Sequence, residues 1–283
     1  MVICEICKEE NMVFVFKIRG RKIYRCKRCG LEKIYPLPSE SELRYIYNDS
    51  YYDAWGPWQK EEVGKVKKET AKHRLNLIPV FKNEKILDCG CASGYFLEVA
   101  KDYGYIPYGF DINISALKIA QEKFSSQQVY FGNIESCPFE KNSFYAIFMS
   151  DFLEHVIDPL LTINKAHSLL KPQGYLVITT PDTNSFSHKV MKNYWPHYKI
   201  EHLFYFNPQN ISLMLKKNGF GIISINRAYK CLTLDYLKSY FQKYPKLGIR
   251  LFLKGLVGLL PSRIRFKRIW FYFGEMVVVA LKS

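Results

Sequence analysis

The sequence feature that most restricts the fold is a short apolar strand that runs into a glycine-rich turn within residues 86–96. The strand ends at Asp88, and the small residues Gly90, Ala92 and Gly94 then allow the backbone to approach a ligand closely. A helix is predicted directly after the turn, so the amide groups of its first turn are available to a polar or anionic ligand. This order of strand, turn and helix indicates a nucleotide-binding site at the carboxyl end of a strand.

The segments that follow alternate between strand and helix patterns. Residues 105–111 again end in an acid, about 20 residues after Asp88, where a carboxylate can accept hydrogen bonds from both hydroxyls of a ribose. Further strands are predicted at 143–151 and 174–182, with an amphipathic helix at 158–170 between them. The alternation predicts an α/β fold with a parallel, doubly wound sheet.

Five motifs taken together resemble those of class I S-adenosylmethionine-dependent methyltransferases. They are Leu-Asp-Cys-Gly-Cys-Ala-Ser-Gly at 87–94, Gly-Phe-Asp at 109–111, Gly-Asn-Ile-Glu at 132–135, Phe-Leu-Glu-His-Val-Ile-Asp-Pro at 152–159 and Leu-Lys-Pro-Gln-Gly-Tyr at 170–175. The resemblance covers about residues 84–225 and implies a Rossmann-like sheet of seven mostly parallel strands. It also implies an enzyme that transfers a methyl group from S-adenosylmethionine. A Rossmann-like domain without a ligand, or a dehydrogenase, is the alternative.

The resemblance also assigns the residues that bind the cofactor. The first acid and the turn are expected to contact its methionine end, and the second acid its ribose. The side chain of Asn133 and the backbone of Ile134 are expected to meet the adenine edge, and the last acid to lie beside the cofactor. The predicted set is Asp88, Gly90, Cys91, Ala92, Gly94, Asp111, Ile112 (packed on the adenine), Asn133, Ile134 and Asp151.

Two of these residues depart from the family pattern. Ala92 occupies the place of the middle glycine of the turn, where we expect its methyl group to be tolerated. Asn133 stands where the family usually has an aspartate facing the adenine amino group. Because an amide oxygen can also accept that hydrogen bond, we expect cofactor binding to be weaker or retuned and not lost.

Four of the eight cysteines form a second motif near the N-terminus. Cys4 and Cys7, then Cys26 and Cys29, make two Cys-x2-Cys pairs separated by 18 residues, which is the spacing of a tetrathiolate zinc ribbon. Such a site is closed and structural. The alternative is a pair of disulfides in a secreted domain. Because no signal peptide pattern begins the sequence, we expect a cytoplasmic protein with reduced thiols.

The other four cysteines are interpreted as small buried apolar residues. They are Cys89, Cys91, Cys137 and Cys231.

The net charge of +15 is concentrated at the two ends of the chain. Residues 1–35 carry nine Lys and Arg against four Asp and Glu, and residues 227–283 carry twelve against two. Residues 36–226 carry twenty of each and are neutral. The basic character therefore belongs to the segments that flank the predicted catalytic core.

The C-terminal part contains an insertion that a minimal methyltransferase domain does not need. Within it, Lys246, Arg250 and Lys254 would form one basic stripe on a helix, beside a broad apolar face. Residues 261–273 then combine cations with five aromatic residues, four of which follow the cations. We expect residues 246–273 to make a peripheral contact with an anionic membrane. The alternative is a helical lid that covers the sheet and the active site.

The predicted domain organisation has five parts. They are a zinc ribbon at 1–35, a helical linker or cover at 36–83, the cofactor-binding core at 84–230, the amphipathic basic insertion or lid at 231–273, and a final antiparallel strand of the core at 274–283.

Two histidines are candidates for a catalytic base. His155 follows a strand at the edge of the sheet where ligands bind, and His202 precedes a helix predicted from the cap Asn207 and from Pro208. Both resemble family positions that line the cofactor and acceptor pocket. Histidine can accept a proton near neutral pH, although an orienting or packing role is the alternative for both. His197, in a loop rich in Trp and Tyr, is a weaker candidate.

The sequence supports more than one acceptor. The first hypothesis is a small-molecule or lipid-linked acceptor, such as a sugar or another hydroxyl or carbon, methylated in the cytoplasm or at the inner face of the membrane. The second is a ribosomal RNA methyltransferase whose zinc ribbon and basic C-terminal block bind phosphates. The third is a non-catalytic binding module in which the ribbon docks a protein.

Overall fold

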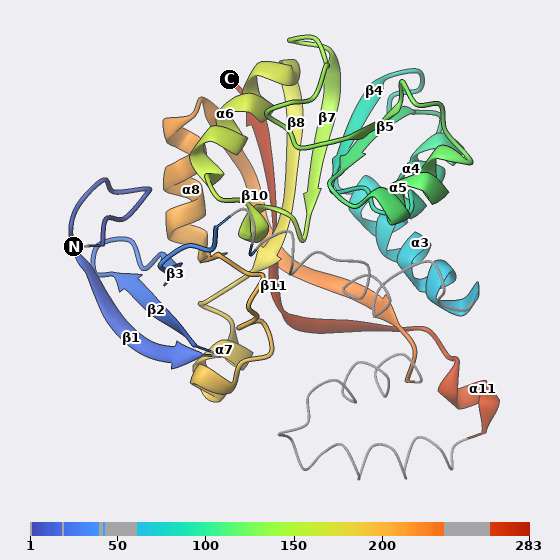
Figure 1. Ribbon diagram of the computed structural model, residues 1–283. Helices are drawn as coiled ribbons and strands as arrows, with labels where there is room; N and C mark the ends of the chain where they lie inside the picture. Colours follow the sequence, from blue (N-terminus) through green and yellow to red (C-terminus); the bar gives the residue numbers. More distant parts are fainter. Residues whose placement is uncertain (1, 19, 40–41, 43–60, 235–260) are drawn as a thin grey trace.

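The computed structural model describes residues 2–18, 20–39, 42, 61–234 and 261–283. Their main element is a seven-stranded sheet with the strand order β10-β11-β8-β7-β4-β5-β6 (Figure 1). Its strands are β4 (Lys85–Cys89), β5 (Ile106–Asp111), β6 (Val129–Phe131), β7 (Phe144–Ser150), β8 (Leu170–Pro181), β10 (Phe220–Leu232) and β11 (Ile269–Lys282). All pairs from β8 to β6 are parallel, and β11 runs antiparallel to both β8 and β10. The predicted doubly wound, mostly parallel sheet of seven strands is confirmed.

Helices cover both faces of this sheet. One face packs against α6 (Pro159–Leu169) and α8 (Pro208–Lys217), and the other against α3 (Glu61–Leu75), α4 (Tyr95–Asp102) and α5 (Ile114–Gln121) (Figure 1). Side chains alternate along the strands, so Leu87 and Val278 join the first core while their neighbours Ile86 and Val277 join the second. The sheet is therefore buried on both sides, and its strand ends are left to form a site.

Three short helices complete the described core, and α6 and α8 begin at capping residues. The short helices are η1 (Leu153–His155), α7 (Phe186–Met191) and η2 (Lys192–Tyr194). Asp158 caps α6 through the amide of Leu161, with a proline in the first turn. Asn207 and Asn210 form a capping box at the start of α8, as the sequence indicated for Asn207.

The N-terminal ribbon (residues 2–35) forms a second, smaller sheet that includes a strand of the core. Its strands β1 (Met12–Ile18), β2 (Arg21–Cys26) and β3 (Glu32–Tyr35) are joined by β9 (Phe204–Tyr205) in the order β1-β2-β3-β9. The side chains of Asn207 and Asn210 donate hydrogen bonds to the carbonyl oxygen of Cys29, at 3.1 and 3.3 Å. The ribbon is thus packed onto the core.

The last two strands of the sheet are longer than the sequence suggested. β10 continues to Leu232, and β11 starts at Ile269, five residues before the expected boundary at residue 274. Their pairing is interrupted by a register shift between Ala228 and Tyr229, opposite Gly274, which has φ +94°. Such a bulge lets a strand bend while it stays paired, so the strand pair extends past the core sheet.

The central part of the predicted insertion lies outside the described residues, and with it Lys246, Arg250 and Lys254. The described remainder contains α11 (Ser262–Arg265), which leads into β11. None of the helices in the described ranges is long and apolar enough to cross a membrane.

Replacement of Gly274 by Ala should destabilise the protein by about 1–3 kcal/mol. A side chain there would be strained at φ +94°, and its Cβ would clash with the hydroxyl groups of Ser185 and Ser187. Gly221→Ala in the same strand pair is the matched control, because the nearest atom to its Cβ would be 3.6 Å away. Urea unfolding measures both variants, and equal stabilities would contradict the expectation.

Candidate active site and cysteine cluster

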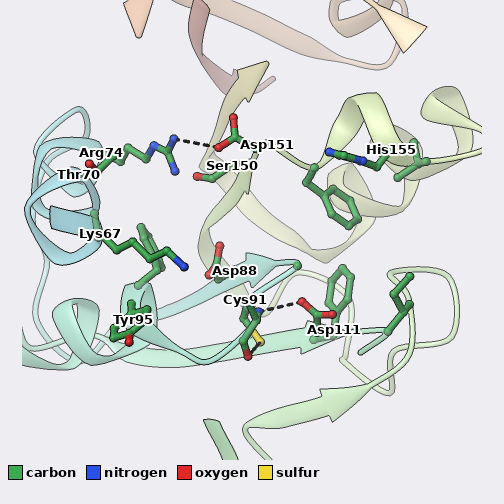
Figure 2. A pocket seen from close by; sticks show the side chains of 18 of the residues that line it. Lys67, Thr70, Arg74, Asp88, Cys91, Tyr95, Asp111, Ser150, Asp151 and His155 are labelled. Carbon is green, nitrogen blue, oxygen red and sulfur yellow. Dashed lines mark hydrogen bonds and ion pairs between the residues drawn. The ribbon is translucent and has the colours of Figure 1, made fainter. Parts of the chain in front are cut away.

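A cavity of about 730 Å³ lies at the carboxyl ends of β4, β5 and β7. Its walls come from α3, from the turn between β4 and α4, from the ends of the central strands, and from β10 and β11. Figure 2 shows Asp88 between Asp111 on one side and Asp151 with Arg74 on the other. We refer to the side of Asp111 as the cofactor end and to the side of Asp151 as the acceptor end.

The glycine-rich turn is fixed by backbone hydrogen bonds to the neighbouring strand. The amides of Gly90 and Cys91 both donate to the carbonyl oxygen of Phe110, at 3.0 Å each. Gly90 adopts φ +75°, Ala92 φ +46° and Gly94 φ +80°, so three residues of the turn have left-handed backbones. Ala92 accordingly occupies a conformation that glycine adopts more readily.

Asp111 is held in place by its own loop. Its carboxylate accepts hydrogen bonds from the amides of Ala92 and Asn113, at 2.8 Å each, and its side chain is buried. Each carboxylate oxygen can accept a second hydrogen bond. The residue therefore presents a fixed pair of acceptors to the cofactor end, which is the arrangement expected for binding two ribose hydroxyls.

Asp88 lies deeper in the same part of the cavity. It is 4% exposed, and burial raises the pKa of its carboxyl to about 8, with Asp111 adding to the rise and Arg74 opposing it. A bound cationic group would reverse this desolvation cost. The position suits the predicted contact with the methionine end of the cofactor, which carries an ammonium group.

The residues predicted to contact adenine are only partly on the cavity wall. Ile112 lines the cavity and is half exposed. Asn133 also lines it, but its amide oxygen already accepts a hydrogen bond from the amide of Ser136 at 2.9 Å. Ile134 is buried in the core and does not line the cavity, whereas Gly132 and Glu135 do. The contact expected of Ile134 is through its backbone, so the burial of its side chain leaves that prediction untested.

The acceptor end contains a partly buried network of charges. The ammonium of Lys230 on β10 lies 3.0 Å from a carboxylate oxygen of Asp151 and 2.7 Å from Glu275 Oε1 on β11. Arg74 on α3 pairs with Asp151 at 3.6 Å. These two cations hold the pKa of Asp151 well below its usual range, against the effect of its burial. Burial instead raises the pKa of Glu275.

Arg74, Lys230 and Glu275 were missed by the sequence analysis, although all three line the cavity. They come from a helix and two strands that are far apart in the chain, so no local spacing links them. One signal was present for Glu275. It is one of only two acids in residues 227–283, and it precedes a continuous apolar run that is typical of a buried strand.

The two predicted catalytic histidines lie together, but only His155 lines the cavity. Its ring is 4.7 Å from that of His202, which is 3% exposed. Burial lowers the pKa of His155 to about 4 and that of His202 well below its usual value. The weaker candidate His197 does line the cavity. The role of any of them as a base stays a prediction.

A group of three residues beside the cavity has the composition of a metal site. One ligand atom from each of Glu154, His155 and His202 lies within 4.8 Å of the others. Glu154 accepts a hydrogen bond from Thr180 at 3.0 Å, and burial raises the pKa of its carboxyl to about 8. Nδ1 of His202 has no partner among the described residues.

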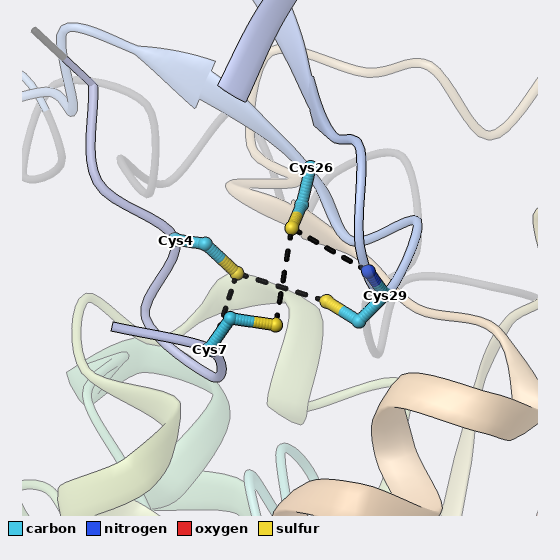
Figure 3. Close-up of side chains that lie close together, drawn as sticks. All are labelled: Cys4, Cys7, Cys26 and Cys29. Carbon is cyan, nitrogen blue, oxygen red and sulfur yellow. Dashed lines mark hydrogen bonds between the residues drawn. The ribbon is translucent and has the colours of Figure 1, made fainter. Parts of the chain in front are cut away.

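The four N-terminal cysteines converge on one point (Figure 3). The Sγ atoms of Cys4 and Cys29 are 3.7 Å apart, and those of Cys7 and Cys26 are 3.9 Å apart. All four are free thiols, because a disulfide would place its sulfurs at about 2.0 Å. A tetrahedral site with metal–sulfur bonds of about 2.3 Å requires sulfurs about 3.8 Å apart, so the cluster has the dimensions of a tetrathiolate metal site. Cys89, Cys91, Cys137 and Cys231 are buried, as predicted.

The Rossmann-like sheet, its glycine-rich turn and the two acids at adjacent strand ends define a class I S-adenosylmethionine-dependent methyltransferase. A family model described as a methyltransferase domain matches residues 63–225, more than half of the chain, and the chain belongs to this family.

Individual relatives are distant. The chain is 26% identical over 204 residues to an uncharacterized protein of Methanocaldococcus jannaschii. The alignment covers 69% of this chain and 81% of that protein. It is 27% identical over 146 residues to the ubiquinone biosynthesis O-methyltransferase of Coxiella burnetii. That alignment covers 49% of this chain and 61% of that enzyme.

Solved structures share the fold. The phosphoethanolamine N-methyltransferase 2 of Haemonchus contortus, solved with phosphomonomethylethanolamine and S-adenosylhomocysteine, matches with a TM-score of 0.56 at 20% identity. The match covers 89% of this chain and 62% of that one.

Asp111→Ala should weaken binding of S-adenosylhomocysteine by roughly 100-fold or more, because two hydrogen bonds to a carboxylate contribute about 3 kcal/mol in total. Titration calorimetry measures the affinity, and circular dichroism checks that the fold persists. Asp102→Ala, at an exposed position on α4, is the matched control and should bind as wild type does. Unchanged affinity of the Asp111 variant would show that the ribose site is assigned to the wrong residue.

Proposed function

We propose that the chain transfers the methyl group of S-adenosylmethionine to a hydroxyl group of a small-molecule or lipid-linked acceptor in the cytoplasm. The observation that carries the proposal is the acceptor end of the cavity. It is a recess formed by α3, β10, β11 and the segment at 197–199, and it contains both apolar and ionisable side chains. Pockets of this composition bind small organic molecules.

The distribution of charge and the relatives support the same proposal. Arg74 and Lys230 are matched by Asp151 and Glu275, so this network has no excess of cations for a phosphate backbone. The similar enzyme of Coxiella burnetii is, by its name, an O-methyltransferase of ubiquinone biosynthesis. An oxygen atom on a lipid-linked ring is therefore one acceptor within the proposed class.

The chain itself has limited chemistry to perform. S-adenosylmethionine supplies an already activated methyl group. Asp88, Asp111 and the turn hold the cofactor, and the acceptor end orients the hydroxyl and removes its proton. His155 is neutral at pH 7, because burial lowers its pKa to about 4, so it enters the reaction as a proton acceptor or as an orienting group.

A label-transfer experiment tests the proposal. Purified protein is mixed with methyl-labelled S-adenosylmethionine and a cell extract separated into lipid, small polar, RNA and protein fractions. We expect label in the lipid or small polar fraction and none with the Asp111→Ala variant. Label in RNA would overturn the proposal in favour of an RNA methyltransferase.

We propose further that the cysteine cluster binds one structural zinc ion through Cys4, Cys7, Cys26 and Cys29. The sulfur separations fit zinc, and thiolates are among its preferred ligands. With four thiolates the site has no open position for a substrate, so its role is to stabilise the ribbon and the segment paired with it.

Metal analysis of the purified protein should give about one zinc ion per chain. Cys26→Ser should lose the metal and lower the melting temperature, because metal binding contributes directly to folding of such sites. Cys231→Ser, buried but outside the cluster, is the control and should keep its zinc. The protein can also be refolded with zinc present and its thiols fully reduced. The absence of bound zinc after that treatment would contradict the proposal.

We propose a peripheral contact between residues 246–273 and an anionic membrane, which the described part of this segment supports. Its exposed apolar residues are interspersed with cations: Ile264, Phe266, Trp270 and Phe271 with Arg263, Arg265, Lys267 and Arg268. Aromatic and basic side chains together suit the headgroup layer of an anionic bilayer.

Phosphatidylserine-containing vesicles should sediment the protein, and neutral phosphatidylcholine vesicles should not. The double variant Phe266→Ser with Trp270→Ser should weaken sedimentation several-fold. Phe14→Ser, an equally exposed aromatic residue on β1, should leave it unchanged. Equal sedimentation of the double variant and wild type would exclude this segment as the contact.

A further inference from the structure

The carboxyl group of Glu275 is only half satisfied. Oε1 accepts a hydrogen bond from Lys230 at 2.7 Å, whereas Oε2 is buried without a hydrogen-bond partner in the described part of the chain. The side chain is 4% exposed and lines the acceptor end of the cavity. A buried carboxylate oxygen without a donor is costly, so this one has the properties of a ligand-binding atom.

His197, the neighbour of this carboxyl group, does not donate the missing hydrogen bond. His197 Nδ1 lies 3.8 Å from Glu275 Oε1, too far for a hydrogen bond, and Nε2 faces the carbonyl oxygen of Phe273 at 3.1 Å. Because that carbonyl can only accept, the hydrogen of the neutral ring is on Nε2 and Nδ1 is an acceptor. Two acceptors therefore face each other at the cavity wall, and a hydroxyl group is the donor that fits beside them.

Two charged neighbours of Glu275, Asp151 and Lys230, are less suited to take a proton. Asp151 is held in its charged form by Lys230 and Arg74, which makes it a weak base. Its two carboxylate neighbours keep Lys230 protonated, because they raise its pKa despite burial. Glu275 is the carboxylate at this end with an unoccupied oxygen, and its burial favours protonation.

We propose that Glu275 binds the acceptor hydroxyl through Oε2 and takes its proton during methyl transfer, with Lys230 holding the carboxyl in place. The inference rests on the proposed function. The O–H bond of the acceptor breaks and its proton passes to Glu275 Oε2. The electron pair of the acceptor oxygen forms the new bond to the methyl carbon, and the pair of the broken S–C bond stays on sulfur. The products are a methyl ether and S-adenosylhomocysteine.

The bulge beside Gly274 explains how Glu275 reaches this position. Glu275 pairs with Pro181 of β8 and Ala228 of β10, so it stands in the interior of the sheet at the level where β7 ends. The register shift between Ala228 and Tyr229 falls directly beside it. Bulges of this kind redirect side chains next to active sites.

Glu275→Gln tests the proposal, because it preserves shape and removes the base. Lys230 keeps Asp151 as its partner in this variant, so the fold should persist. The probe is the extract fraction that wild type labels, used at increasing amounts. We expect kcat to fall at least roughly 100-fold while the Kd for S-adenosylhomocysteine changes less than threefold. Glu140→Gln, an exposed glutamate, is the matched control.

Glu275→Asp is the second variant and keeps a carboxylate that is one methylene shorter. It should fold and retain more activity than the Gln variant, because it keeps the base. A kcat of Glu275→Gln within threefold of wild type would overturn the proposal. If the Gln variant does not fold, Glu275→Ala is measured instead, and a kcat within threefold of wild type there has the same meaning.

The outcome also separates this inference from the proposed function. If wild type labels RNA, the proposed acceptor class is wrong, and the same variants are then compared on that RNA. Loss of activity there would retain Glu275 as the base for a different acceptor, and full activity would remove it from the mechanism.

Discussion

The pairing of the partly buried Lys230 ammonium with two carboxylates is the interaction on which both the sheet and the site depend. It joins Asp151, at the end of β7, to Glu275 on β11, while Lys230 itself lies on β10. Arg74 connects α3 to Asp151. These ion pairs join α3, β7, β10 and β11, so the elements are held in one relative position. The positions of the strand ends, and hence the shape of the acceptor end, follow from this network.

The N-terminal ribbon stabilises the part of the cavity wall that carries His197. Glu32 on β3 is fully buried, and its carboxylate accepts hydrogen bonds from Arg25 at 2.7 Å and from the hydroxyl of Tyr198 at 2.5 Å. Tyr198 directly follows His197 of the cavity wall, and β9 pairs with β3 a few residues later. The cysteine cluster fixes the loops from which β2 and β3 extend, so its geometry and that of the histidine-bearing segment are coupled. This contact gives the ribbon a role within the chain that needs no external partner.

The parts of the site that could be predicted from the sequence are those built from local chain geometry. Asp88, the turn after it and the cysteine pairs are recognisable because a few adjacent residues carry both the conformation and the chemistry. The acceptor end could not be predicted in this way, because Arg74, Lys230 and Glu275 meet only through the order of the strands. His202 shows a related limit. Its motif places it beside His155, but whether its side chain enters the cavity or the core depends on packing from distant elements.

The two ends of the cavity therefore differ in how they can change. The cofactor end relies on backbone amides and on one carboxylate fixed by its own loop, so few substitutions there keep the geometry. The acceptor end relies on side chains from β10, β11 and the segment at 197–199, which contribute little to the turn. A substitution at such a side chain can alter which acceptor fits without displacing the cofactor. The motifs that identify the methyltransferase class lie at the cofactor end and do not include Arg74, Lys230 or Glu275. Under the proposed function, they therefore carry little information about which acceptor is methylated.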